Sequence, residues 1–210
     1  MKYEIIDISP PISSTSPVFP GDTSFCKEEL LSFEKGNHLT LSTIRTTTHI
    51  GAHADAPIHY HANGITIEQR NLEYYLGPVN VLDAGHVKNC RILPEHINND
   101  LITTNRVLFK TQSFPHNGPW QNNFTSLSPE IINLLAEKNV KTVGIDTPSV
   151  DPANSKELET HRNIFTHNMA ILEGIDLDQV EPGEYFLNAL PLKIKKGDAS
   201  PVRAVLLKFK

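Results

Sequence analysis

The segment THIGAHADAPIHY, residues 48–60, concentrates side chains of the types that bind transition metals. Those side chains are His49, His53, Asp55 and His59. Imidazole and carboxylate groups are the ligands that divalent transition metals commonly take from proteins. The segment therefore predicts a metal site. For each residue taken alone, the alternative is an ordinary side chain in a histidine-rich surface loop.

The spacing of these four residues is typical of an extended chain. On a helix, Asp55 would lie almost opposite His53, whereas in an extended segment all four odd-numbered positions face the same side. Gly51 and Pro57 also disfavour a helix interior. In an extended chain, Gly51 would let the backbone bend around an ion. We therefore expect the four side chains to face one cavity.

The neighbouring segments are expected to hold this motif in place. Residues 39–48 alternate and are rich in β-branched side chains, which predicts a strand that runs directly into His49. Ser128, Pro129 and Glu130 form a helix start, with an apolar stripe that continues to residue 137. A second helix is expected at 155–167, and shorter ones at 67–75 and 94–98. Further strands are expected at 5–8, 28–34, 79–84, 107–111, 140–146, 185–192 and 201–209.

The order of these elements indicates the fold class. A helix followed by the apolar strand at 140–146 is typical of a buried parallel or mixed sheet. We expect an α/β fold in which a mixed sheet is layered with helices. Because repeats, low-complexity runs and linker-like segments are absent from the sequence, we expect one domain over residues 1–210.

Composition excludes several classes of function. A net charge of −5 gives no footprint for nucleic acid or an anionic membrane surface, and no apolar run is long enough to span a bilayer. The first residues lack the pattern of a secretory signal. The two cysteines, Cys26 and Cys90, form no disulfide framework and are expected to be buried or partly buried thiols. These features predict a cytoplasmic location.

Several motifs carry a resemblance to a known family. The segment HIGAHADAPIH resembles the HxGTHxDxPxH motif of the cyclase-type metal-dependent hydrolases, with Ala52 where that motif usually has threonine. DISPPIS, PVFPGDT, GIDTPSVDP, NMAILEG and DASPVRAVL resemble, more narrowly, the bacterial kynurenine formamidase (arylformamidase) branch. The similarity runs from Ile5 to Leu206 and is weakest at 89–123. It implies a swivelling β/β/α cyclase-like fold.

The resemblance also implies the second half of the metal site. By themselves, His161 would be a solvated helix residue and Glu173 a surface acid. Their separation of twelve residues matches the pair that completes the site in the family. The implied picture has two divalent ions per subunit, zinc being expected and manganese the alternative. One ion has the ligands His49, His53 and Asp55. The other has Asp55, His161 and Glu173, so Asp55 bridges.

Two further residues have expected roles. His59 has no obvious place among the ligands, so we expect it to act as general base and then acid. Direct attack on the carbonyl and a supporting hydrogen bond are its alternatives. The resemblance implies that Phe19 forms an aromatic wall of the substrate site. From the sequence alone, Phe19 would be an aromatic side chain that anchors its loop on the core. Trp120 is expected to be structural, with a rim position over the site as its alternative.

The resemblance implies hydrolysis of N-formyl-L-kynurenine to L-kynurenine and formate, a step of tryptophan catabolism. The nearest alternative is a related hydrolase that acts on a cyclic imide, an isatin-like lactam or another aryl amide. An alternative of a different class is a metal-binding or sensor protein without turnover. The expected partner is a small-molecule substrate, not nucleic acid or membrane. The resemblance implies a homodimer or homotetramer.

Overall fold

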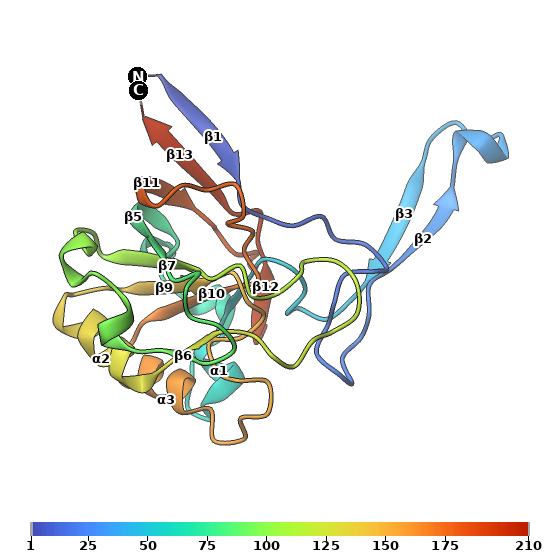
Figure 1. Ribbon diagram of the computed structural model, residues 1–210. Helices are drawn as coiled ribbons and strands as arrows, with labels where there is room; N and C mark the ends of the chain where they lie inside the picture. The colour runs from blue at the N-terminus through green and yellow to red at the C-terminus, as the bar shows by residue number, and fades with distance from the viewer. Residues whose placement is uncertain (1, 210) are drawn as a thin grey trace.

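The computed structural model describes residues 2–209 (Figure 1). The strands are β1 (Tyr3–Asp7), β2 (Cys26–Leu31), β3 (Leu41–Arg45), β4 (His53–Asp55), β5 (Leu76–Asp83), β6 (Arg91–Ile92), β7 (Arg106–Lys110), β8 (Ser126–Leu127), β9 (Thr142–Ile145), β10 (Ala170–Glu173), β11 (Gly183–Asn188), β12 (Ala199–Pro201) and β13 (Val205–Phe209). The α-helices are α1 (Pro57–Tyr60), α2 (Pro129–Glu137) and α3 (Glu159–Thr166). The 3-10 helices are η1 (Phe33–Lys35), η2 (Ile67–Gln69), η3 (Leu72–Tyr74), η4 (Pro94–His96) and η5 (Asn99–Leu101).

Most strands belong to one mixed sheet. Within residues 2–209 its order is β1-β13-β11-β5-β7-β9-β10-β4-β12. The central strands β5, β7, β9 and β10 are parallel, and the other neighbouring pairs are antiparallel. Helices α2 and α3 lie together on one side of the sheet (Figure 1). The prediction of an α/β fold with a mixed sheet and helices layered on it is confirmed.

The sheet is packed on both faces by two hydrophobic clusters. Because neighbouring side chains of a strand point to opposite faces, Val107 and Phe109 join the cluster beneath α2 and α3, whereas Leu108 joins the other cluster. Strands β9 and β10 are buried at every position. Such strands, covered on both faces, are the apolar runs that the sequence predicted for a parallel region.

Helix α2 begins as expected. The Ser128 side chain accepts a hydrogen bond from the Ile131 amide, and Pro129 occupies the first turn. Helix α3 is shorter than predicted, because Leu158 has a left-handed backbone, with φ 48°, that a continuous α-helix cannot contain. No helix within residues 2–209 combines the length and apolar character needed to cross a bilayer.

The histidine-rich segment 48–60 is not one extended segment, so that prediction is wrong. The chain turns before His53, and Gly51 has φ 56° there. Only His53–Asp55 form strand β4. Helix α1 then begins at Pro57, whose missing N–H costs nothing at a first helical position, and carries His59. His49 therefore lies in a turn and His59 in a helix. Their odd-numbered positions do not explain which way their side chains point.

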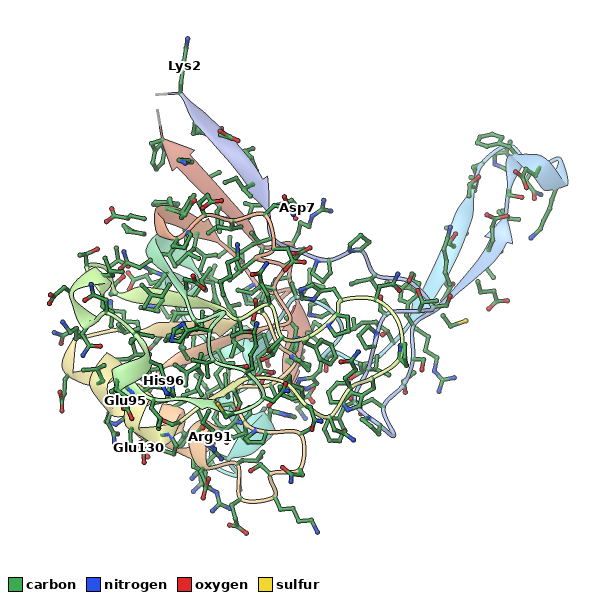
Figure 2. The ribbon with its side chains drawn as sticks, in the orientation of Figure 1. Lys2, Asp7, Arg91, Glu95, His96 and Glu130 are labelled. Carbon is green, nitrogen blue, oxygen red and sulfur yellow. The ribbon has the colours of Figure 1, made fainter. Side chains whose placement is uncertain are left out.

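Two pairs of strands extend away from the body. Strands β2 and β3 form a separate ribbon that projects far from the main sheet (Figure 1). Strands β1 and β13 extend at another edge, where Lys2 lies at the outer end of β1 and Asp7 at its inner end (Figure 2). The expectation that both cysteines are buried or partly buried is wrong: Cys26 begins β2, Cys90 lies in a loop, and both are exposed.

Candidate metal centre

Two paired strands and one helix bring the predicted ligands together. Strands β4 and β10 are antiparallel, and their register places Glu173 opposite His53. Asp55 is two residues from His53 on β4 and so points to the same side. His161 projects from α3 and His49 from the turn before β4. Residues from three distant parts of the chain therefore converge on one point.

Asp55 lies at the centre of this group. Its Oδ1 is 3.0 Å from His49 Nδ1 and 3.6 Å from His53 Nε2, and its Oδ2 is 3.5 Å from His161 Nε2. Glu173 closes the ring, because its two oxygens lie 3.2 Å from His53 Nε2 and 3.7 Å from His161 Nε2. All of these side chains except that of His49 are nearly fully buried.

The donor set fits divalent cations. Among residues 2–209, neither buried oxygen of Asp55 makes a hydrogen bond of normal geometry, although His49 is close. A buried carboxylate without such bonds is costly unless a cation compensates it. Two triads of ligand atoms, each within 4.8 Å of one another, share this residue: His49, Asp55 and His59, and His53, Asp55 and Glu173. A carboxylate common to two triads is suited to bridging two ions. The first triad also gives His59 a position among ligand atoms, which the sequence did not suggest.

The charges of the site depend on one another. Burial disfavours the charged form of each histidine, but nearby carboxylates outweigh burial and raise the pKa of His49 to about 9 and that of His161 to about 10. Burial would raise the pKa of Asp55, but His49 and His161 hold it well below its usual range. Metal ligands bind in deprotonated form, so a bound cation would displace these protons.

Asp151 is a functional residue that sequence reasoning missed. Its Oδ2 is 2.8 Å from His161 Nδ1 and also accepts a hydrogen bond from the His161 amide. Arg91 approaches the other oxygen at 3.3 Å; its position near α2 and α3 is visible in Figure 2. A carboxylate on the far nitrogen of a histidine fixes its tautomer and directs the other nitrogen toward a metal. Asp151 therefore orients His161 toward Asp55.

Asp151→Asn is expected to weaken metal binding by roughly 10- to 100-fold, because an amide holds the imidazole less firmly and does not raise its basicity. Calorimetric titration of chelator-treated protein with zinc measures the effect. Asp178→Asn, at an exposed position, is the matched control. Unchanged zinc affinity in Asp151→Asn would show that His161 is oriented without it.

Asp198, to which the sequence pattern gave no role, lies near both His49 and His59. Its Oδ2 is 3.2 Å from His49 Nε2 and 4.0 Å from His59 Nδ1. The His49 and His59 rings lie 4.2 Å apart. Burial lowers the pKa of His59, which favours its neutral form. His59 is thus a half-exposed imidazole that faces both the ligand group and an open cavity.

A cavity of about 370 Å³ opens above the ligands. His49, His53, His59, His161, Glu173 and Asp198 line its floor. Phe19 and Trp120 form part of its wall, with their ring centroids 5.2 Å apart in an edge-to-face arrangement. Phe114 also lines the cavity and packs on Trp120. Phe19 therefore lines this cavity, and its contact with a substrate stays a prediction. Trp120 lines the cavity as well, which agrees with its alternative position.

Comparison with known proteins gives one family and a consistent fold. The sequence model of the cyclase family matches residues 6–152. A solved structure described as a potential metal-dependent hydrolase with cyclase activity is 28% identical, with a TM-score of 0.82, and the match covers 100% of both chains. A predicted metal-dependent hydrolase from Bacillus stearothermophilus is 29% identical, with a TM-score of 0.81, and 99% of each chain is covered.

A more distant structure shares the same architecture. Isatin hydrolase A from Labrenzia aggregata, solved with benzyl benzoate, is 23% identical, with a TM-score of 0.81. The match covers 99% of this chain and 94% of that one. At this identity the likeness shows a common fold.

Proposed function

The chain belongs to the cyclase family, and from this premise we propose that it is a metal-dependent amide hydrolase. The observation that carries the proposal is the position of Asp55, a buried carboxylate common to two triads of ligand atoms beside an open cavity. We further propose two ions per subunit, with zinc as the expected metal and manganese as the alternative. Mixed imidazole and carboxylate donors suit both metals.

The residues around the cavity have distinct tasks in the proposed hydrolysis. Metal ions held by the five ligands would supply Lewis-acid chemistry, because they lower the pKa of water and polarise a carbonyl oxygen. His59 takes a proton from the attacking water and returns it to the nitrogen of the leaving amine. Asp198 places a carboxylate 4.0 Å from His59 Nδ1, which is close to that imidazole but beyond hydrogen-bond distance. Phe19 and Trp120 exclude water from one side and hold an aryl group.

The proposed substrate is N-formyl-L-kynurenine, which would yield L-kynurenine and formate. Its support is the set of motifs that resemble the kynurenine formamidase branch, together with the aromatic wall beside the ligands. An aryl formamide presents a ring to that wall and its carbonyl to the floor. The competing proposal is a related activity on a cyclic imide, an isatin-like lactam or another aryl amide, for which the same wall would serve.

Hydrolysis of N-formyl-L-kynurenine by purified protein tests the proposal, measured before and after chelation and then with zinc and manganese restored separately. We expect activity to disappear on chelation and to return with one of the two metals. A parallel panel of isatin, a cyclic imide and formanilide tests the competing substrates. Metal binding without turnover of any of these amides would contradict the hydrolase proposal.

His59→Ala separates catalysis from metal binding. We expect the rate of hydrolysis to fall by roughly 10²- to 10⁴-fold, because proton transfer loses its positioned imidazole, while two ions per subunit stay bound. Rates and metal content are measured on the same sample. His61→Ala, in which the neighbouring histidine stacked on Phe165 is removed, is the matched control. Loss of one ion from His59→Ala would instead assign His59 to the ligands.

We also propose that the protein forms a homodimer or homotetramer. The support is the ribbon of β2 and β3, which projects from the body and carries exposed Leu30, Phe33, Leu41 and Ile44. A two-stranded ribbon gains little stability in water by itself and is stabilised when another surface covers it. Light scattering of the purified protein measures the assembly. The single domain and the cytoplasmic location stay predictions.

A further inference from the structure

A second cavity, of about 170 Å³, lies on the other side of helix α1 from the first. His59 lines the first cavity, whereas its neighbour Tyr60 lines the second. Two of its lining residues, Asn63 and Asn168, are exposed, so solutes can reach it. Its volume equals roughly that of six water molecules in the liquid. The cavity therefore has room for a small organic molecule.

A buried cation forms part of this cavity. Arg70 is only 5% exposed. Its guanidinium donates to Asn168 Oδ1 at 3.0 Å and to the Met169 carbonyl at 2.9 Å, and its Cζ lies 4.1 Å from the Tyr74 ring centroid. All three partners are neutral. Among residues 2–209, Arg70 makes no ion pair with a carboxylate, and its Nε makes no hydrogen bond of normal geometry, although the neutral Tyr75 hydroxyl is close. A buried charge without a counter-ion is strongly destabilising.

Further buried donors accompany Arg70. The Tyr60 hydroxyl is buried and, within the described part of the chain, has no hydrogen-bond partner, whereas the buried Tyr75 hydroxyl lies within hydrogen-bonding reach of Arg70 itself. Tyr60 lines the cavity with Arg70, and both hydroxyls lie in the electrostatic field of the guanidinium. A phenol and a guanidinium both offer N–H or O–H groups. Hydrogen-bond donors grouped around one positive charge can bind an anion.

We propose that this cavity binds a small monocarboxylate, whose charged end pairs with Arg70 and whose tail lies against apolar side chains. Ile65, Phe165 and Met169 provide those apolar walls. Phe165 is held by His61, whose ring stacks on it at 3.7 Å. A guanidinium pairs with a planar carboxylate more favourably than with a spherical ion. None of the proposed metal ligands lines this cavity, although the Tyr60 ring lies 5.1 Å from that of His161, and the site does not depend on the proposed hydrolysis.

Thermal unfolding of the metal-loaded protein tests the proposal, at constant ionic strength in a sulfonate buffer. The protein is titrated with acetate, with butyrate and with bromide, a spherical anion that should pair less favourably with the guanidinium than a carboxylate does. We expect a saturable rise in Tm, because a ligand that binds only the folded state stabilises it. Each buried methylene strengthens binding roughly fourfold, so butyrate, which has two more methylenes than acetate, should saturate at about sixteenfold lower concentration. Arg70→Met should remove this shift, and Arg45→Met, on the exposed strand β3, should keep it.

The controls separate this site from the metals and from loss of folding. A carboxylate effect that persists unchanged in Arg70→Met would belong to the metal centre and would overturn the proposal. If Arg70→Met does not fold, Tyr60→Phe replaces it as the test. This variant loses only one hydroxyl and should bind butyrate about fivefold more weakly. A crystal grown with butyrate then decides directly: density for the carboxylate at Arg70 supports the site, and only ordered water there refutes it.

Discussion

Asp55→Asn should abolish stoichiometric metal binding and reduce hydrolysis by about a thousandfold or more. The amide keeps one oxygen, but that oxygen is neutral, and the NH₂ group cannot bind a metal. Asp55 is the one residue common to both triads of ligand atoms within residues 2–209, so its loss affects both positions at once. Metal content after dialysis against trace zinc, followed by rate measurements on the same sample, gives both effects.

The comparison with a remote variant makes the Asp55 result interpretable. Asp100→Asn makes the same chemical change at an exposed position and should bind metal and hydrolyse substrate normally. Circular dichroism of both variants shows whether the fold is retained. If Asp55→Asn bound two ions with unchanged affinity, the bridging assignment and the proposed mechanism would both fail.

Gly174→Ala should lower the free energy of unfolding by roughly 3 kcal/mol or more and disrupt the metal centre. Gly174 follows the ligand Glu173 and has φ 62°, which alanine adopts at a cost. A Cβ atom there would lie 2.3 Å from the Gly51 carbonyl oxygen and 2.9 Å from its carbon. Both atoms belong to the backbone of the turn before His53, so relief requires the two ligand segments to separate.

Gly36→Ala separates the two causes. Gly36 has φ 79°, but its Cβ would meet nothing within 4 Å, so only the backbone cost applies, about 1 kcal/mol. Urea denaturation in the presence of chelator compares the two variants without the contribution of bound metal. Equal destabilisation of the two would show that the contact with Gly51 has no role. Metal titration of the folded Gly174→Ala protein then measures the effect on the ligands.

Local patterns in the sequence predicted the elements better than they predicted the site geometry. The capping serine of α2 and the apolar run of β9 depend on neighbouring residues, and both appear where expected. The motif itself does not run straight, because Gly51 turns the chain and Pro57 begins a helix. Residue types therefore identified a candidate ligand set, while the parity argument for its geometry was wrong.

Contacts between distant residues were the hardest to foresee. Asp198 lies 149 residues from His49, and no periodicity reports such a separation. Asp151 is ten residues from His161, beyond the reach of helix spacing. Both acids stand in segments that carry the family resemblance, DASP and SVDP, and this was the available signal. His161 and Glu173 likewise became candidates through the resemblance, and the structure places them beside Asp55.

The face of strand β4 opposite the candidate ligands bears on how the metal site could evolve. Ala52, Ala54 and Ala56 alternate with the ligands His53 and Asp55 and pack into the hydrophobic cluster behind them. Side chains this small bring the strand close to its neighbours, so a larger residue at any of the three would push the ligands forward. Selection for altered metal preference could thus act through these alanines, none of which is a candidate ligand. Suppressors of a weakened metal site are expected at the same positions.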